Sequence, residues 1–181
     1  MSSTPTGTPP AARARPLMES TALAAQAAQC LRDNGGPVPW SPEDAAQVTR
    51  YMAHAVFAPG TRLFSGGEQG DGAYMLLILE GEVAVEAADG TPIAVVGPGG
   101  ILGEMALLDR GLRAANCTAV SPVQAGALSV RGLQRLIDDQ PRAATRLLGM
   151  LAQRLAERLR GQIDQLQVYA ELNDSLQQRL G

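Results

Sequence analysis

One segment of the sequence, GEMALLDRGLRAA at 103–115, combines residue types that could bind a charged ligand. Gly103 precedes a short apolar run typical of a single helical turn, and the backbone N–H groups at a helix start attract anions. The guanidinium of Arg113 can form two parallel hydrogen bonds to a phosphate. Glu104, at the same turn, can accept hydrogen bonds from sugar hydroxyls. Together these residues predict a pocket for a ribose phosphate.

A structural ion pair between Glu104 and Arg113 is the alternative interpretation. Burying both charges without a ligand costs desolvation energy that their attraction need not offset, so we favour a ligand. The sequence has no visible set of nucleophile, base and orienting group, and no cluster of metal ligands. We therefore expect neither an enzyme nor a metal site, and we place Cys117 in the core and His54 near a helix end.

The middle of the chain has the pattern of short antiparallel strands. From Phe57 onward, glycines recur every few residues and separate segments such as YMLLILEG, EVAVEA and TPIAVV. Apolar or alternating segments of this length are typical of strands, and Asp89-Gly90 is a hairpin signal. We expect an α+β fold built on an antiparallel β-roll, a jelly-roll-like barrel, which the helical turn at 104–109 interrupts.

Helices are expected before the roll. The alanine-rich segment 17–33 has strong helix propensity and ends at Asn34-Gly35-Gly36, a good C-terminal stop. A second helix is expected over 41–56. Its N-cap is Ser41 and its first helical residue is Pro42, a combination that favours helix initiation.

Helices are also expected after the roll. A short helix over 131–140 precedes Pro141, and beyond it leucines recur at steps of three and four. A continuous helix here is roughly 55 to 60 Å long, which is more than one small roll can cover. We therefore expect its distal half to contact a partner, and we favour a second copy of the chain. Gly149 and Gly161 are positions where it could bend.

The expected organisation has four parts. They are a disordered tail over 1–16, an N-terminal helix and connector over 17–40, the β-roll with short flanking helices over 41–141, and a long C-terminal dimerisation or partner helix over 142–181.

The composition of the chain argues against several classes of protein. The formal net charge of −3 argues against general binding to nucleic acid, which requires clustered cations. No run of about 18 apolar residues is present to cross a membrane, and the N-terminus lacks the apolar core of a signal peptide. Cys30 and Cys117 suggest neither a disulfide nor a zinc site. We expect a cytoplasmic protein without membrane insertion.

The chain resembles the cyclic nucleotide-binding domain family, of the catabolite activator protein and cAMP-dependent kinase regulatory subunit type. The resemblance covers about residues 41–160. It is carried by the phosphate-binding cassette, Gly103–Leu108 with Arg113-Ala114-Ala115, and by PGTRLFSGGEQGD (59–71), EGEVAV (80–85) and LQRLI (133–137). It implies a β-roll, a cyclic nucleotide as ligand with no cofactor, and no catalysis.

The resemblance also assigns roles to residues of the phosphate and ribose site. Glu104 would accept a hydrogen bond from the ribose 2′-hydroxyl, and Arg113 would pair with the cyclic phosphate. The anion site would be completed, next to Gly103, by the backbone amides of Met105, Ala106 and Ala115.

The resemblance says less about which nucleotide base the pocket would bind. Val85 would form part of the apolar wall. Family members selective for cGMP carry a hydroxyl residue directly after the arginine, whereas Ala114 stands here, which favours cAMP and leaves cGMP as the alternative. Arg158 and Leu159 align with the Thr-Ser pair by which catabolite activator protein reads adenine. Arg158 could stack on either purine or donate to guanine acceptors.

The output of the protein is expected to be a protein contact. The transcription-factor relatives continue into a winged helix-turn-helix, and we expect no such DNA-binding domain from LQVYAELNDSLQQRLG, which follows the family-like region here. The interpretation is a cyclic nucleotide sensor with an unidentified protein partner. Two alternatives stay open, a scaffold of the same fold that binds no nucleotide and a receptor for a cyclic dinucleotide such as c-di-GMP.

Overall fold

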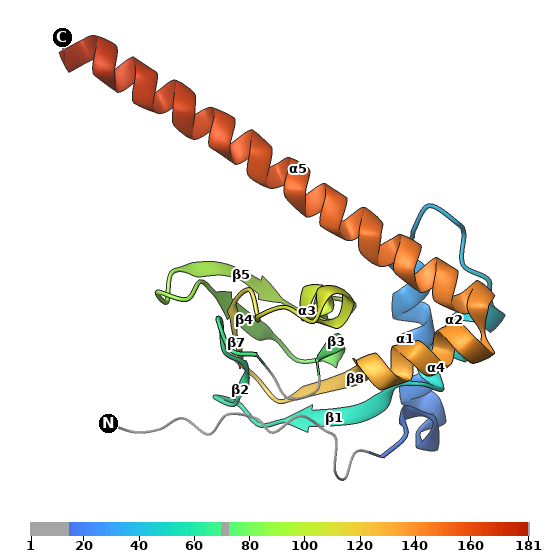
Figure 1. Cartoon of the computed structure of the whole chain (residues 1–181). Coiled ribbons are helices and arrows are strands. Elements are labelled where there is room, and N and C mark those ends of the chain that lie inside the picture. Colours follow the sequence, from blue (N-terminus) through green and yellow to red (C-terminus); the bar gives the residue numbers. More distant parts are fainter. Residues whose placement is uncertain (1–14, 70–72, 181) are drawn as a thin grey trace.

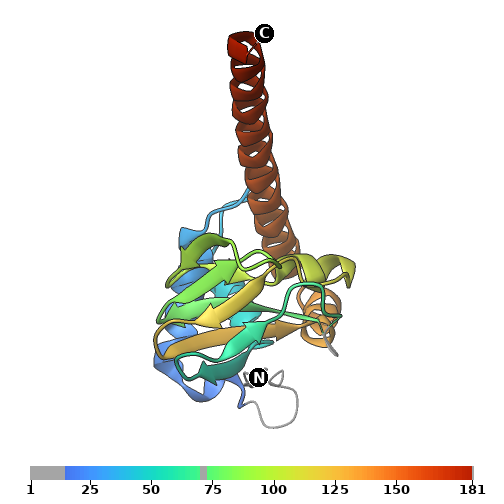
Figure 2. The same ribbon diagram turned by 90° about the vertical axis from the view of Figure 1, so that its left-hand side faces the viewer.

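The structure is a computed structural model that describes residues 15–69 and 73–180. Its strands form two four-stranded antiparallel sheets (Figures 1 and 2). The first sheet contains, in order, β1 (Ala53–Phe57), β8 (Val123–Ser129), β3 (Tyr74–Glu80) and β6 (Ile101–Leu102). The second contains β2 (Arg62–Phe64), β7 (Asn116–Ala119), β4 (Val83–Glu86) and β5 (Pro92–Val96). The expected α+β fold with an antiparallel β-roll is confirmed.

The strand β3 is buried on both faces and joins two hydrophobic cores. Side chains on its first face lie between the two sheets: Tyr74, Leu76 and Ile78. Side chains on its second face pack against the helices: Met75, Leu77 and Leu79. Alternate residues of a strand point to opposite faces, so a strand covered on both sides needs an unbroken apolar run. The segment YMLLILE meets that requirement.

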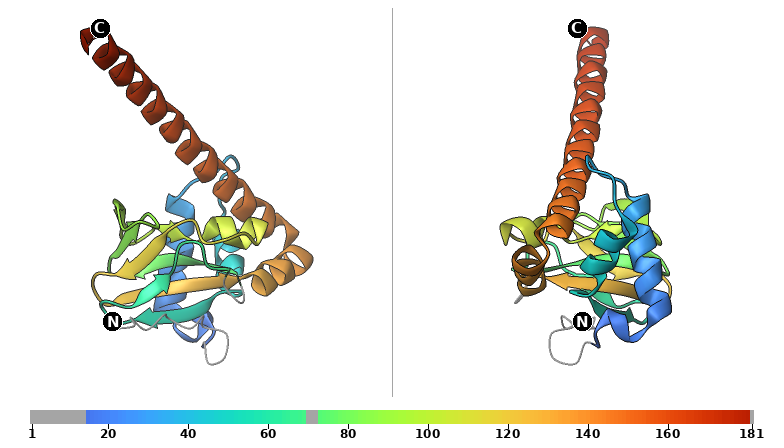
Figure 3. Two further views of the ribbon diagram at one scale, coloured as in Figure 1. Left: turned by 60° about the vertical axis from the view of Figure 1, so that its left-hand side comes forward. Right: turned by 90° about the vertical axis from the view of Figure 1, so that its right-hand side faces the viewer.

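The helices cover the outer face of the first sheet. They are a 3₁₀ turn η1 (Leu17–Glu19), α1 (Thr21–Asp33), α2 (Pro42–Thr49), α3 (Glu104–Asp109), α4 (Val130–Asp139) and α5 (Pro141–Leu180). Figure 3 shows α1, α2 and α4 on the side of the roll from which α5 starts. The expected N-cap of α2 is confirmed, because the Ser41 hydroxyl accepts a hydrogen bond from the Asp44 amide at 3.1 Å.

The segment 41–56 is only partly helical, which corrects one prediction. The helix α2 ends at Thr49, and Ala53–Phe57 forms β1, paired residue by residue with β8. His54 therefore lies on a strand and not near a helix end, with its Nε2 3.0 Å from Oε1 of Gln124. Pairing with β8 buries Ala55 and Phe57, and this tertiary gain outweighs the helix propensity of alanine.

The N-terminal segment 1–14 lies outside the described residues. Arg15 and Pro16, which the sequence places at the end of a disordered tail, pair with β1. The backbone carbonyl of Arg15 accepts from the His54 amide at 2.8 Å, and Pro16 forms a bridge with Ala53. The described part of the chain thus begins at the edge of the first sheet.

The helix α5 leaves the body of the protein after its first three turns. Its buried residues end at Leu151, whereas Leu159, Ile163 and Leu166 are 57%, 46% and 67% exposed. The helix is continuous through Gly149 and Gly161, and Figure 1 shows its distal part extending beyond the roll. A membrane-spanning helix is not found among the described residues, where no helix combines sufficient length with sufficient apolar character.

The double-sided burial of β3 predicts a large loss of stability on truncation between the sheets. Replacing Leu76, which is fully buried, by alanine should lower the free energy of unfolding by about 2–5 kcal/mol, because the cavity cannot close between two paired sheets. Urea unfolding followed by circular dichroism measures this loss. The control is Val56→Ala on β1, whose side chain is 66% exposed and should cost under about 1 kcal/mol.

Candidate functional site

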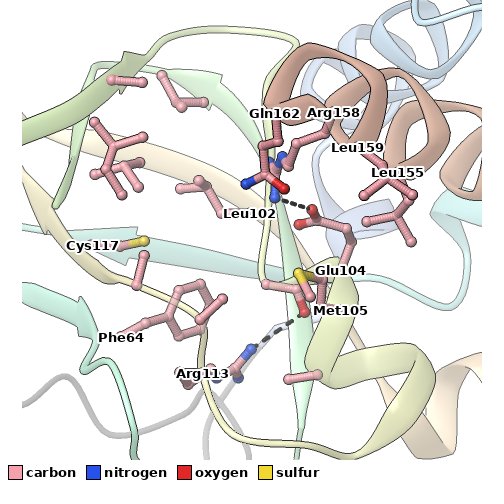
Figure 4. A pocket seen from close by; sticks show the side chains of 18 of the residues that line it. Phe64, Leu102, Glu104, Met105, Arg113, Cys117, Leu155, Arg158, Leu159 and Gln162 are labelled. Atoms are coloured by element: carbon pink, nitrogen blue, oxygen red, sulfur yellow. Dashed lines mark hydrogen bonds and ion pairs between the residues drawn. The ribbon is translucent and has the colours of Figure 1, made fainter. Parts of the chain in front are cut away.

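A pocket of about 760 Å³ lies between the second sheet, α3 and the middle of α5 (Figure 4). This volume is within the range of small-molecule sites, roughly 300–1,000 Å³. The residues singled out in the sequence all line it: Val85, Gly103, Glu104, Met105, Ala106, Arg113, Ala114, Ala115 and Arg158. The fold therefore brings these residues together from β4, α3, the segment before β7 and α5.

The first turn of α3 presents free backbone amides at the pocket. Gly103 is its N-cap in the left-handed conformation, with φ of 76°. The first hydrogen bond of the helix runs from the Leu107 amide to the Gly103 carbonyl, at 3.3 Å. The amides of Glu104, Met105 and Ala106 precede that bond and so have no intrahelical acceptor.

Position 103 also has no room for a side chain, because Arg113 and its neighbours fill the adjacent space. A Cβ at position 103 would lie 2.6 Å from Nη1 of Arg113, 2.9 Å from the Tyr74 carbonyl oxygen and 3.0 Å from the Phe64 ring. Real Cβ atoms do not approach other atoms so closely. The lack of a side chain at this position thus makes room for the guanidinium.

The guanidinium of Arg113 is buried and held by neutral groups. Its Nη1 donates to the carbonyl of Tyr74 at 2.9 Å and to that of Gly103 at 3.4 Å. The guanidinium carbon lies 3.9 Å from the centre of the Phe64 ring, a cation–π contact. Burial lowers the pKa of Arg113, but the ordinary value is so high that the group stays charged at neutral pH. The pocket therefore contains a fixed positive charge.

The carboxylate of Glu104 is buried at the centre of the pocket and pairs with α5. Its Oε1 lies 2.9 Å from Nη1 of Arg158, and Figure 4 marks this contact. The ion pair of Glu104 is thus with Arg158 and not with Arg113, which corrects the alternative interpretation of 103–115 as a self-contained pair. Among the described residues, Glu104 and Arg113 therefore do not pair with each other, and each can bind a different part of a ligand.

The rest of the pocket wall is largely apolar. Sequence reasoning placed Val85 here but missed Phe64, Ile93 and Leu102 as lining residues. The thiol of Cys117 also faces the pocket from β7, and burial raises its pKa to about 12, so it stays protonated at neutral pH. The expectation that Cys117 belongs to the core is confirmed.

Three arginines on one side of α5 bind the body of the protein. Arg146 pairs with Asp44 of α2 at 2.7 Å, Arg154 donates to the Asn34 side chain, and Arg158 pairs with Glu104. A locally basic helix of this kind is, from its sequence alone, typical of a solvated face. These contacts instead attach α5 to α2, to the end of α1 and to the pocket, in that order along the helix.

A metal site has no visible basis among the described side chains. Where the structure describes side chains, no group of three His, Cys, Asp or Glu residues could hold a metal ion. The polar groups of the pocket are suited to binding one anion and one hydroxyl-rich group.

Comparison with protein families identifies the domain. Residues 54–140, from β1 to α4, match the family model of the cyclic nucleotide-binding domain. These residues are a cyclic nucleotide-binding domain. The cassette Gly103–Ala115 lies at its centre, and its buried Glu104 and Arg113 line the pocket.

Similar proteins include two regulators described as responding to cAMP. A CRP-like cAMP-activated global transcriptional regulator of Mycobacterium tuberculosis is 29% identical over 116 residues, covering 63% of this chain and 52% of the relative. The cyclic AMP receptor protein of Thermus thermophilus is 31% identical over 121 residues, covering 65% and 55%. The chain spans about half the length of these relatives.

A solved structure extends the similarity to most of the chain. The crystal structure of a cyclic nucleotide-binding domain from Methylobacillus flagellatus KT superposes with a TM-score of 0.73 at 27% identity. The match covers 87% of both chains. The β-roll and a large part of the helical region are thus shared with that domain.

The close packing at Gly103 predicts opposite effects for two glycine-to-alanine variants. Gly103→Ala should lower the free energy of unfolding by about 1–3 kcal/mol, because alanine is strained at this φ and displaces Arg113. Gly161→Ala should raise it by about 0.5–1 kcal/mol, since Gly161 is helical with open space around it. Chemical denaturation of both variants measures the two signs, and equal stability of Gly103→Ala and the wild type would contradict the role of Gly103.

Proposed function

We propose that this protein is a non-catalytic cyclic nucleotide sensor, with cAMP as ligand, that signals through protein contacts. The observation that carries the proposal is the buried cation of Arg113. It faces a pocket of ligand size and contacts only carbonyl oxygens and aromatic rings among the described residues.

A cyclic phosphate supplies the charge that this site lacks. An uncompensated buried cation is costly, and a bound anion removes that cost. The guanidinium can donate from its remaining N–H groups, and the amides of Met105 and Ala106 have no acceptor within α3. The resemblance assigns the backbone amide of Ala115 to the same anion site, and both Ala115 and Gly103 line the pocket.

Glu104 is the natural partner of the ribose. Arg158 contacts Oε1, and a carboxylate has two oxygens with about four acceptor positions in total. Oε2 can therefore accept the ribose 2′-hydroxyl while the ion pair persists. A buried carboxylate would repel a second phosphate at this position, which argues against a cyclic dinucleotide.

Two observations favour cAMP over cGMP as the ligand. Ala114 stands where cGMP-selective family members have a hydroxyl residue. The two regulators named above are described as cAMP-responsive, although each is about twice as long as the matched segment.

Binding would be lost when the buried cation is removed. Arg113→Ala should reduce cAMP affinity at least about 100-fold, because the variant loses charge-assisted hydrogen bonds worth roughly 1.5–3 kcal/mol each. Isothermal titration calorimetry on protein freed of bound nucleotide measures this loss. Circular dichroism must show that the variant is folded, since the side chain also packs on Phe64 and Tyr74.

The matched control is Arg160→Ala, which removes the same charge from an exposed position of α5 outside the pocket. It should bind cAMP like the wild type. A wild type that binds no cyclic nucleotide would instead favour the scaffold without a ligand, and saturation by c-di-GMP alone would favour a dinucleotide receptor.

We further propose that the distal half of α5 pairs with a second copy of the chain. Leu159, Ile163 and Leu166 are exposed at steps of four and three residues along one helix, which is the spacing of a coiled-coil seam. A change in the pocket can reach this seam because Arg158, which contacts Glu104, precedes Leu159 directly.

A charge within the seam should prevent pairing. Leu166→Glu should convert a dimer into a monomer, because two carboxylates would face each other in an apolar interface. Sedimentation equilibrium measures the mass. Gln167→Glu introduces the same charge on the next residue of the helix and should leave the dimer intact; loss of the dimer in both variants, or a monomeric wild type, would contradict the proposal.

A further inference from the structure

The polar side chains of the pocket differ in how far the protein already uses them. Glu104 and Arg158 are bound to each other, and Arg113 donates to two backbone carbonyls. Gln162 and Gln165 of α5 also line the pocket, and neither amide has a hydrogen bond to another described residue. A carboxamide carries both a donor and an acceptor, so these two groups are available to read a ligand.

Gln162 lies at the end of the pocket opposite to the phosphate-binding cation. Figure 4 shows its side chain next to Arg158, pointing from α5 toward the cavity, with Glu104 between it and Arg113. The order of groups across the pocket is thus cation, carboxylate and carboxamide. A nucleotide presents phosphate, ribose and base in the same order.

Apolar residues line much of the pocket. Val85 and Ile93 line it from the β4–β5 hairpin, and Leu155 and Leu159 line it from α5. A flat purine ring fits between two such apolar surfaces and loses contact with water there. The polar edge of the ring then needs a partner, and Gln162 lines the same pocket.

Arg158 is a poor candidate for reading the base, in contrast to the sequence-based alignment. Reading guanine would require its guanidinium to donate to two base acceptors. Arg158 would then have to leave Glu104, whose side chain is only 7% exposed, and a buried carboxylate without its partner is costly. Arg158 is therefore a positioning residue for Glu104.

We propose that Gln162 is the residue that reads the base and that it selects adenine over guanine. This inference rests on the proposed function of the same pocket. The Gln162 amide can accept from N6 of adenine and donate to N7 at the same time. Guanine presents two acceptors, O6 and N7, on that edge, so the amide oxygen would face an acceptor and one interaction would be lost or repulsive.

The test compares cAMP and cGMP affinities across α5 variants by isothermal titration calorimetry. Wild-type protein should prefer cAMP. Gln162→Met keeps the length and helix propensity of the side chain but removes both polar atoms. It should weaken cAMP binding about tenfold and cGMP binding far less, within the roughly 5- to 150-fold discrimination of a bidentate contact, so the affinity ratio moves toward one.

Three further variants make the result specific. Gln167→Met makes the same chemical change on α5 outside the pocket and should keep the wild-type affinity ratio. Arg158→Met should weaken both nucleotides by similar factors and leave the ratio unchanged, because Glu104 loses its positioning partner. Gln165→Met should affect the ratio less than Gln162→Met does. Circular dichroism and sedimentation confirm that each variant keeps its helix and its mass.

The outcomes separate this inference from the proposed function. If the wild type binds cAMP but Gln162→Met keeps the full preference, the assignment of Gln162 is overturned while the sensor stands. The same holds if Arg158→Met or Gln165→Met removes the preference instead. A wild type that prefers cGMP overturns both the assignment of Gln162 and the choice of cAMP, but not the binding of a cyclic nucleotide. Wild-type protein that binds neither nucleotide overturns both proposals.

Discussion

The burial of the Arg113 guanidinium is the constraint on which the pocket depends. A charge in this position needs hydrogen-bond acceptors and polarisable neighbours, which the Tyr74 carbonyl and the Phe64 ring supply. Tyr74 belongs to the central strand β3 and Phe64 to the second sheet, so both sheets hold the cation. Gly103 completes the arrangement by contributing no side chain where the guanidinium lies.

A second interaction joins the pocket to the long helix α5. Glu104 and Arg158 form an ion pair between the start of α3 and the middle of the long helix. Arg154, one turn earlier, donates to Asn34, which itself donates to the Gly99 carbonyl before β6. The middle of α5 is thus held by polar contacts and not by deep apolar burial, which ends at Leu151. The Glu104–Arg158 ion pair connects the pocket directly to the middle of α5, so the position of the helix and the arrangement of the pocket depend on each other.

The sequence predicted the parts whose signals are local. The Ser41 cap, the Asp89-Gly90 hairpin between β4 and β5 and the turn at α3 each depend on a few neighbouring residues. The strand at Ala53–Phe57 was missed, because alanine favours helices and only pairing with β8 makes this segment extended. The role of Arg158 was also missed, since nothing local connects position 158 with position 104.

The sequence by itself determined the β-roll, the flanking helices and the set of residues that line the pocket from the cassette. These features depend on short-range patterns, namely glycine spacing, apolar runs and the 103–115 segment. Short-range patterns can be recognised directly in the sequence. Only the tertiary structure decided which charges pair. Arg113 contacts carbonyls and rings, Arg158 takes Glu104, and Gln162 is left uncommitted in the part of the pocket that the structure describes. Those partnerships depend on how α5 crosses the roll, and that crossing results from the packing of distant elements into one core.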